Sequence, residues 1–328
     1  MNSRREFIKR TALGATALSL NPSNLLSKPN LTQLTILHTN DMHSHIQPFE
    51  SGRNKGLGGM SQRATIIKKI REEGNQVLLL DAGDIFQGTP YFNVYGGELE
   101  FKLMSEIGYD ASTIGNHDFD NGIDGLVKQL PHANFPFIVS NYDFSNTAME
   151  GNYLKYKVFN KGGLKVGVFG IGIKLEGLVP KSLYQNTLYQ DPIEKSNYYS
   201  DYLKNKLSCD LVICLSHLGF KYNSKKISDY ILASKSKYID LIIGGHTHTF
   251  MNKPERVKNM DNKIVQIAQV GWGGINIGRI DYFFDQKFCV KNIEGNSFFF
   301  MFRFPKFPMF SPNRTNEKTL HFKHLRQI

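Results

Sequence analysis

Residues 35–43, TILHTNDMH, pass from an apolar strand into the polar cluster Asn40-Asp41-Met42-His43. The same step from strand to polar cluster occurs four more times along the chain. The later clusters are Asp81-Ala82-Gly83-Asp84, residues 115–120 (GNHDFD), Ser216-His217 and residues 244–248 (GGHTH). In open α/β sheets, functional sites assemble at the carboxyl ends of strands. The five clusters therefore predict a single site at one edge of the fold.

Between these clusters, short β-branched or leucine-rich runs alternate with amphipathic stretches. Strands are predicted at 34–39, 76–80, 111–114, 137–139, 153–159, 165–171, 211–215 and 241–243. Helices are predicted at 60–73, 98–107, 122–130, 192–207 and 225–234. Segments 263–269 and 274–284 are expected to form a closing antiparallel pair. This β-α rhythm with β-β additions indicates a layered α/β domain with mixed sheets.

Charge and hydropathy exclude two other classes of protein. The net charge of +11 is concentrated in the leader, where Arg4, Arg5, Lys9 and Arg10 outnumber Glu6, and in residues 286–328, which hold eight lysines and arginines against two glutamates. The segment between them is nearly neutral and has no basic stripe with interleaved aromatic residues, so no nucleic-acid partner is expected. No apolar run approaches the ~18–20 residues of a membrane-spanning helix, so no transmembrane segment is expected.

The N-terminus resembles an export signal. Ser3-Arg4-Arg5-Glu6-Phe7-Ile8-Lys9 precedes a short and weakly apolar run over residues 11–20. Paired arginines before such a run are typical of a bacterial twin-arginine signal peptide. We therefore expect residues 1–30 to be this signal, cleaved at a site between about residues 20 and 30, and the protein to be periplasmic or extracellular.

The polar clusters offer carboxylate and amide oxygens together with neutral imidazoles. This donor set suits divalent Zn, Mn, Fe, Co or Mg better than metals that prefer thiolates. The donors exceed what one tetrahedral ion needs, so two ions that share a carboxylate are expected. Gly83, Gly115 and Gly245 allow close backbone approach at a crowded centre. The remaining histidines fall outside the pattern and are interpreted as surface or packing residues: His38, His45, His132, His321 and His324.

These motifs resemble the calcineurin-like metallophosphoesterase superfamily, and specifically the N-terminal metallophosphatase domain of secreted 5′-nucleotidases. The matching stretches are residues 35–43 (TILHTNDMH), 81–88 (DAGDIFQG), 108–120 (GYDASTIGNHDFD), 216–219 (SHLG) and 244–248 (GGHTH). The resemblance covers roughly residues 34–284. It implies a four-layer α/β/β/α sandwich with mixed sheets over residues 31–285.

The resemblance also implies roles for individual residues. One metal would be held by Asp41, His43, Asp84 and His248. The other metal would be held by Asp84, Asn116, His217 and His246, with Asp84 bridging the two ions. His117 would contact the substrate phosphate, and Asp120 would orient the imidazole of His117.

The implied reaction is hydrolysis of a phosphomonoester, most of all a 5′-nucleotide, by in-line attack of a hydroxide that bridges the two metals. Several alternatives stay open. The first alternative is a broad-specificity phosphatase. The second is a catalytic subunit that needs a separate nucleotide-binding chain of the C-terminal type. The third is a 2′,3′-cyclic phosphodiesterase or UDP-sugar hydrolase. A related exported enzyme that cleaves a sulfur ester fits the same motifs. The non-enzyme alternative is a periplasmic module that binds metal or nucleotide.

Residues 286–328 break the pattern of the domain. They are basic and rich in phenylalanine, and three prolines interrupt any regular period between residues 296 and 328. We expect an atypical tail that is disordered, binds a partner, or is out of frame. The segment is too short to form the second domain from which the resemblance expects a nucleotide pocket.

Overall fold

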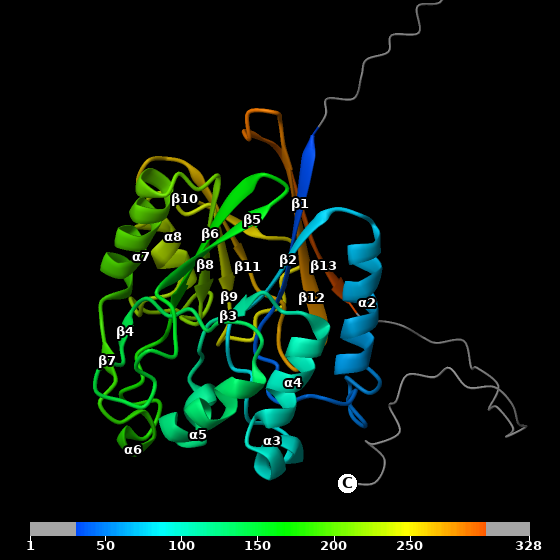
Figure 1. The fold of residues 1–328 in the computed structure, drawn as a ribbon, viewed down its shortest axis with the longest axis vertical. Helices are drawn as coiled ribbons and strands as arrows, with labels where there is room; N and C mark the ends of the chain where they lie inside the picture. The colour runs from blue at the N-terminus through cyan, green and yellow to red at the C-terminus, as the bar shows by residue number, and fades with distance from the viewer. Residues whose placement is uncertain (1–30, 300–328) are drawn as a thin grey trace, which may run out of the picture.

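Two mixed β-sheets pack face to face at the centre of the protein, and helices cover both outer faces (Figure 1). The computed structural model describes residues 31–299. The layer between the sheets is apolar and fully buried, with Ile36 and Leu78 from one sheet against Val168 and Ile213 from the other. This arrangement confirms the predicted four-layer α/β/β/α sandwich.

The first sheet has five strands. In spatial order they are β13 (Val290–Phe299), β12 (Asn276–Phe284), β1 (Thr32–Thr39), β2 (Gln76–Asp81) and β3 (Ala111–Ser112). Strands β1, β2 and β3 are parallel, whereas β12 pairs antiparallel with β1. The outer face is covered by α2 (Met60–Glu72), α3 (Pro90–Tyr95), α4 (Glu98–Ile107) and α5 (Gly122–Gln129). Figure 1 shows α2 and α4 along this face.

The second sheet has six strands. In spatial order they are β10 (Glu255–Lys258), β11 (Ile264–Ala268), β9 (Leu241–Gly244), β8 (Leu211–Ser216), β6 (Leu164–Ile171) and β5 (Tyr156–Lys161). Strands β6, β8, β9 and β11 are parallel. Their outer face packs against α7 (Pro192–Asp201), the π-helical turn η3 (Tyr202–Lys206) and α8 (Asp229–Ser234).

Shorter elements complete the chain. They are η1 (His117–Phe119), η2 (Leu130–His132), α6 (Lys181–Tyr184) and the two-stranded sheet of β4 (Tyr142–Asp143) and β7 (Leu188–Tyr189). The predicted strand at 137–139 is reduced to isolated bridges at Phe137 and Ile138. No helix within residues 31–299 has the length and apolar character needed to cross a bilayer.

The helix boundaries follow local chemistry. Helix α4 ends at Gly108, which adopts the left-handed conformation (φ 81°) that closes a helix without a Cβ clash. Helix α7 begins after Asp191, whose carboxylate accepts hydrogen bonds from the backbone N–H groups of Ile193 and Glu194. Pro192 follows at the first helical position, where its missing N–H costs nothing.

The predicted pairing of segments 263–269 and 274–284 is wrong. Strand β11 lies in the second sheet between β10 and β9, and β12 lies in the first sheet beside β1. The connection between them crosses from one sheet to the other instead of turning back. Gly271, Gly273 and Gly274 all have positive φ in this connection, and the N–H of Gly273 donates to the carbonyl of Asp41 at 2.7 Å. A glycine-rich connection of this length has the composition of a hairpin turn. The sequence pattern therefore predicts a hairpin where the chain crosses between the sheets.

Beyond residue 285, where the domain is predicted to end, the chain continues as strand β13 of the first sheet. Strand β13 pairs antiparallel with β12 along its whole length, from Val290 opposite Phe284 to Phe299 opposite Asn276. Backbone hydrogen bonds define this edge strand, and side-chain periodicity does not reveal them. The remainder of the predicted tail, residues 300–328, and the predicted signal, residues 1–30, lie outside the described residues.

Candidate dinuclear metal site

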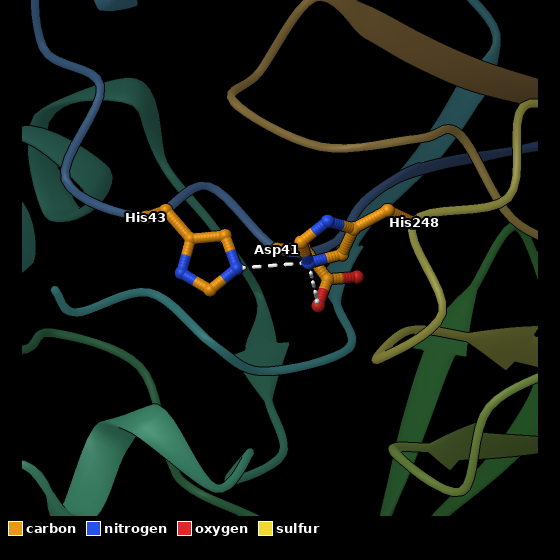
Figure 2. A group of neighbouring side chains, drawn as sticks. All are labelled: Asp41, His43 and His248. Carbon is orange, nitrogen blue, oxygen red and sulfur yellow. Dashed lines mark hydrogen bonds and ion pairs between the residues drawn. The ribbon is translucent and has the colours of Figure 1, made fainter. Parts of the chain in front are cut away.

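The five strand-end loops that carry the polar clusters meet at one edge of the sandwich, as the parallel strands require. Two groups of possible metal ligands form there. Asp41, His43 and His248 make one, here called the outer group, and Asp84, His217 and His246 make the other, the inner group. Within each group the ligand atoms all lie within 4.8 Å of one another. Figure 2 shows the outer group, in which a ring nitrogen of His43 and one of His248 point toward each other beside Asp41.

Asp84 belongs to the inner group and also faces the outer group. Its Oδ2 atom is 3.0 Å from Nε2 of His217 in the inner group and 4.0 Å from Nε2 of His43 in the outer group. Its Oδ1 atom accepts a hydrogen bond from the backbone N–H of His117 at 2.7 Å. The carboxylate is therefore oriented so that both groups can share it.

His217 provides a test of whether a cation fits the inner group. The ring is fully buried, and Nδ1–H donates to the carbonyl of Ala82 at 2.6 Å. Nε2 has no hydrogen-bond partner and faces the carboxylates of Asp84 and Asp41, 3.0 and 3.8 Å away. Burial lowers the pKa of His217, but these carboxylates outweigh it and raise the pKa to about 10. The position thus requires positive charge, which a metal cation supplies without a proton.

His246 and Asn116 complete the inner group. The amide Oδ1 of Asn116 lies 2.7 Å from Nδ1 of His246, so the two ligand atoms are directed to the same place. The backbone N–H of His246 donates to both carboxylate oxygens of Asp41, at 2.9 and 3.0 Å. Burial lowers the pKa of His246 to about 4. Its imidazole is therefore neutral at ordinary pH, the form that binds a metal.

The outer group also fits a cation. The Nε2 atoms of His43 and His248 are 3.0 Å apart, and Nε2 of His248 is 3.5 Å from Oδ1 of Asp41. At this distance the lone pairs of two ring nitrogens that face each other repel. A positive charge between or beside the nitrogens removes that repulsion. Burial lowers the pKa of His43. Two imidazoles and a carboxylate are thus held in position for a divalent ion.

The loops carry an unusual backbone conformation that sequence reasoning missed. Positive φ values between 47° and 70° occur at five of the predicted ligands: Asp41, His43, Asp84, His246 and His248. Non-glycine residues rarely adopt this region, and clusters of them mark functional sites. Among these five residues only Asp84 and His246 adjoin a glycine, so the sequence carries little signal of this conformation. A Cβ at Gly115 would lie 2.1 Å from Oδ1 of Asp84, and one at Gly83 would lie 2.5 Å from the nitrogen of Gly115, which confirms the expected close approach.

Asp118 supports the loop that carries Asp84. The side chain is fully buried and accepts hydrogen bonds from the N–H groups of Gly115, Asp84, Ile85 and Phe86, at 2.8 to 3.1 Å. In the sequence this residue belongs to the GNHDFD cluster, but nothing there assigns it a role. Four donors on one carboxylate fix the loop backbone and thereby the position of Asp84.

Glu100 supports the outer group from α4, where the sequence gives no signal. Its buried carboxylate accepts a hydrogen bond from the hydroxyl of Ser44, the residue after His43. Thr89 donates from its hydroxyl to the carbonyl of Ser44 at 2.8 Å. These contacts hold the turn on which His43 is placed.

His117 stands beside both groups and faces an open pocket of about 360 Å³. Nδ1 of His117 lies 2.8 Å from Oδ2 of Asp120, and this hydrogen bond raises the pKa of His117. The pocket is lined by His43, His45, Gln87, Gly88, His117, His248 and Trp272.

Three other described histidines lie outside the two ligand groups. His38 is buried and packs against Gly278, and His132 is partly exposed near Glu98. His45, interpreted from the sequence as a surface or packing residue, lines the pocket beside His43. His321 and His324 lie outside the described residues.

The family comparison agrees with the fold and with the paired ligand groups. The model of the calcineurin-like phosphoesterase family matches residues 34–250, and the chain belongs to this family. Calcineurin-like phosphoesterases use two divalent metal ions, and the inner and outer groups supply two sets of donors for them.

Similar proteins include several 5′-nucleotidases. Snake venom 5′-nucleotidase of Gloydius brevicauda is 36% identical over 286 residues, which are 80% of this chain and 47% of that protein. Human 5′-nucleotidase is 33% identical over 287 residues, 80% of this chain and 49% of that protein. A crystal structure of a 5′-nucleotidase precursor from Thermus thermophilus matches with a TM-score of 0.74 and 30% identity, covering 81% of this chain and 54% of that one. The chain thus spans about half the length of these relatives.

Proposed function

We propose that this chain is a dinuclear-metal phosphohydrolase that cleaves phosphomonoesters, and 5′-nucleotides in particular. The observation that carries the proposal is the position of Asp84 in the inner group and facing the outer group, with His117 directly beside both groups. A shared carboxylate is the arrangement that two neighbouring cations need, and paired cations are typical of phosphoester hydrolysis.

We assign one metal to Asp41, His43, Asp84 and His248, and the other to Asp84, Asn116, His217 and His246. When bound, the pair of ions supplies a nucleophile at neutral pH and neutralises charge on the phosphate. The chain itself sets the donor positions through hydrogen bonds behind the ligands. These include the carbonyl of Ala82 behind His217 and the N–H of His246 on Asp41.

His117 and Asp120 are assigned to the substrate. The Nδ1 proton of His117 is held by Asp120, so the opposite ring nitrogen, Nε2, can contact the phosphate. The hydrogen bond to Asp120 favours the imidazolium, which stabilises negative charge on the phosphate oxygens or gives a proton to the leaving alkoxide.

The domain organisation is part of the proposal. Residues 1–30 form a twin-arginine signal, so the enzyme works in the periplasm or outside the cell. The metallophosphoesterase domain follows and includes β13. A separate nucleotide-binding chain is the alternative source of specificity, and it predicts poor turnover by this chain alone with rescue when that partner is added.

The test is a substrate screen of the metal-loaded protein. It compares nucleoside mono- and diphosphates, UDP-sugars, cyclic nucleotides and an aryl phosphate, each with and without manganese. The proposal expects metal-dependent release of phosphate from 5′-mononucleotides. Preference for 2′,3′-cyclic nucleotides or UDP-sugars would reassign the substrate, and no turnover of any ester by protein that holds two metals would overturn the enzyme assignment.

A further inference from the structure

Two aromatic rings, those of Trp272 and His45, line the pocket at the metal site, and the ring of Phe49 packs against both. The ring of Trp272 lies nearly parallel to that of the ligand His248, with centroids 5.8 Å apart and planes inclined by 15°. His45 meets Trp272 edge-on at 5.3 Å and stacks on Phe49 at 4.3 Å. Phe49 meets Trp272 edge-on at 5.4 Å. Trp272, His45 and Phe49 are therefore one packed set of rings, here called the aromatic wall, and it begins at a metal ligand.

The aromatic wall is held by the backbone. The N–H of Gly273, next to Trp272, donates to the carbonyl of Asp41 at 2.7 Å. A Cβ at Gly273 would lie 2.7 Å from the ring of Phe49, so only glycine allows this contact. Nδ1 of His45 donates to the carbonyl of His43 at 2.9 Å. The wall is thus fixed to the loops that carry the outer group, and little ordering is needed when a ligand binds.

The wall extends away from the metals into a second hollow. This groove of about 520 Å³ shares His45 with the metal-site pocket and is lined further along by Phe49, Pro90, Tyr91 and Tyr95. When the phosphate of a substrate lies near His117 and the outer group, the rest of the ester can extend only toward the open side of the pocket. These rings lie along that side. Flat apolar ligands gain by stacking on such rings.

We propose that the aromatic wall of Trp272, His45 and Phe49 binds the base of the substrate, so that this chain itself selects phosphoesters whose leaving group carries an aromatic ring. The inference rests on the proposed phosphohydrolase function and names its substrate class. Trp272 and Phe49 are specificity residues, because they contact the leaving group and neither the metals nor the phosphate.

The first test compares AMP with ribose 5-phosphate, which have the same ester bond and differ only in the base. Stacking of one base contributes ~1–3 kcal/mol, about 5-fold to 150-fold in kcat/KM. We expect the wild-type protein to prefer AMP by at least about 5-fold. Phe49→Leu and Trp272→Leu should each lower, several-fold, the ratio of kcat/KM for AMP to kcat/KM for ribose 5-phosphate. Phe250→Leu is the matched control, because its ring contacts Gly271 in the same loop but lines neither hollow.

The second test does not depend on catalysis. Trp272 is the single tryptophan of the chain, so its fluorescence reports on the wall alone. Adenosine should change this fluorescence with saturation, ribose should not, and Phe49→Leu should weaken the adenosine response.

These measurements separate failure of the inference from failure of the proposed function. Saturable binding of adenosine at Trp272 without turnover of either ester would support the wall and overturn the phosphohydrolase. Turnover of both esters with equal kcat/KM, unchanged ratios in Phe49→Leu and no fluorescence response to adenosine would overturn the wall alone. If Trp272→Leu lowered kcat/KM equally for both esters and also lost metal, the proposal of the aromatic wall would be overturned. Trp272 would then be a support for His248.

Discussion

The inner and outer ligand groups contain similar side chains in very different surroundings. In the inner group, His217 has no exposed surface and is fixed by the carbonyl of Ala82, and the backbone N–H of His246 is fixed by the carboxylate of Asp41. In the outer group, the side chain of His248 is 38% exposed and rests on the ring of Trp272. Ligands that are already fixed lose less freedom when an ion binds, so the inner group should hold its metal more tightly. The outer ion should be the one that exchanges with the medium.

Asp84→Asn should have the largest effect and should remove the difference between the groups. The amide lacks the negative charge that both groups share, so we expect loss of both metals and a fall in kcat of about 1,000-fold or more. Metal content by elemental analysis and phosphate release measure these effects. Asp261→Asn, an exposed carboxylate on a turn, is the control and should change neither. Retention of one full metal equivalent by Asp84→Asn would show that the groups are independent.

His117→Asn should separate chemistry from metal binding. His117 belongs to neither group, so turnover should fall by about 100- to 1,000-fold while metal content stays near normal. Parallel measurements of metal content and kcat check this outcome. Loss of the metals in this variant would mean that His117 is itself a ligand.

His248→Ala and His246→Ala compare the groups directly. His248→Ala should weaken only the second metal equivalent, by about 100-fold, and excess manganese should restore part of the activity. His246→Ala should leave an activity that excess metal does not rescue, because it removes an imidazole donor from the buried inner group, beside Asn116. Metal titrations followed by activity give both results, with His132→Ala as the control. Equal rescue of the two variants would contradict the ranking of the groups.

Glu100→Ala should produce the smallest effect and should touch only the outer group. Loss of its contact with Ser44 frees the turn that carries His43, so affinity for the second metal should fall by about 10-fold. Glu100→Gln keeps an acceptor for the Ser44 hydroxyl and should stay near wild type. Glu106→Ala, an exposed glutamate on the same helix, is the control. An unchanged metal titration for Glu100→Ala would show that Thr89 suffices to hold the turn.

The sequence predicted most of the sandwich because its strands are short, apolar and followed by polar clusters. Helix α4 and the strands before Asp41, Asp84 and His217 lie where the pattern places them, within a few residues. The convergence of these clusters follows from parallel strand ends alone. The roles given to the individual site residues stay predictions.

What the sequence did not predict depends on contacts between distant segments. Glu100 meets Ser44 across 56 positions, and nothing local marks either residue. The crossing between β11 and β12 is held by contacts with distant residues, among them the hydrogen bond from the N–H of Gly273 to the carbonyl of Asp41. Strand β13 is defined by the strand beside it. Such features become visible only when the partner segment is in place.

The left-handed backbone at Asp41, His43, Asp84, His246 and His248 has a consequence for the motions of the chain. Each such residue costs about 1 kcal/mol or more, and the cost is borne by loops and not by strands. Bound ions offset it, so removal of the ions should loosen these loops while the sheets stay intact. Amide hydrogens in the ligand loops should then exchange with solvent faster in the metal-free chain, whereas those of β1 and β8 keep their protection. The supply of metal would thereby control the rigidity of the ligand loops.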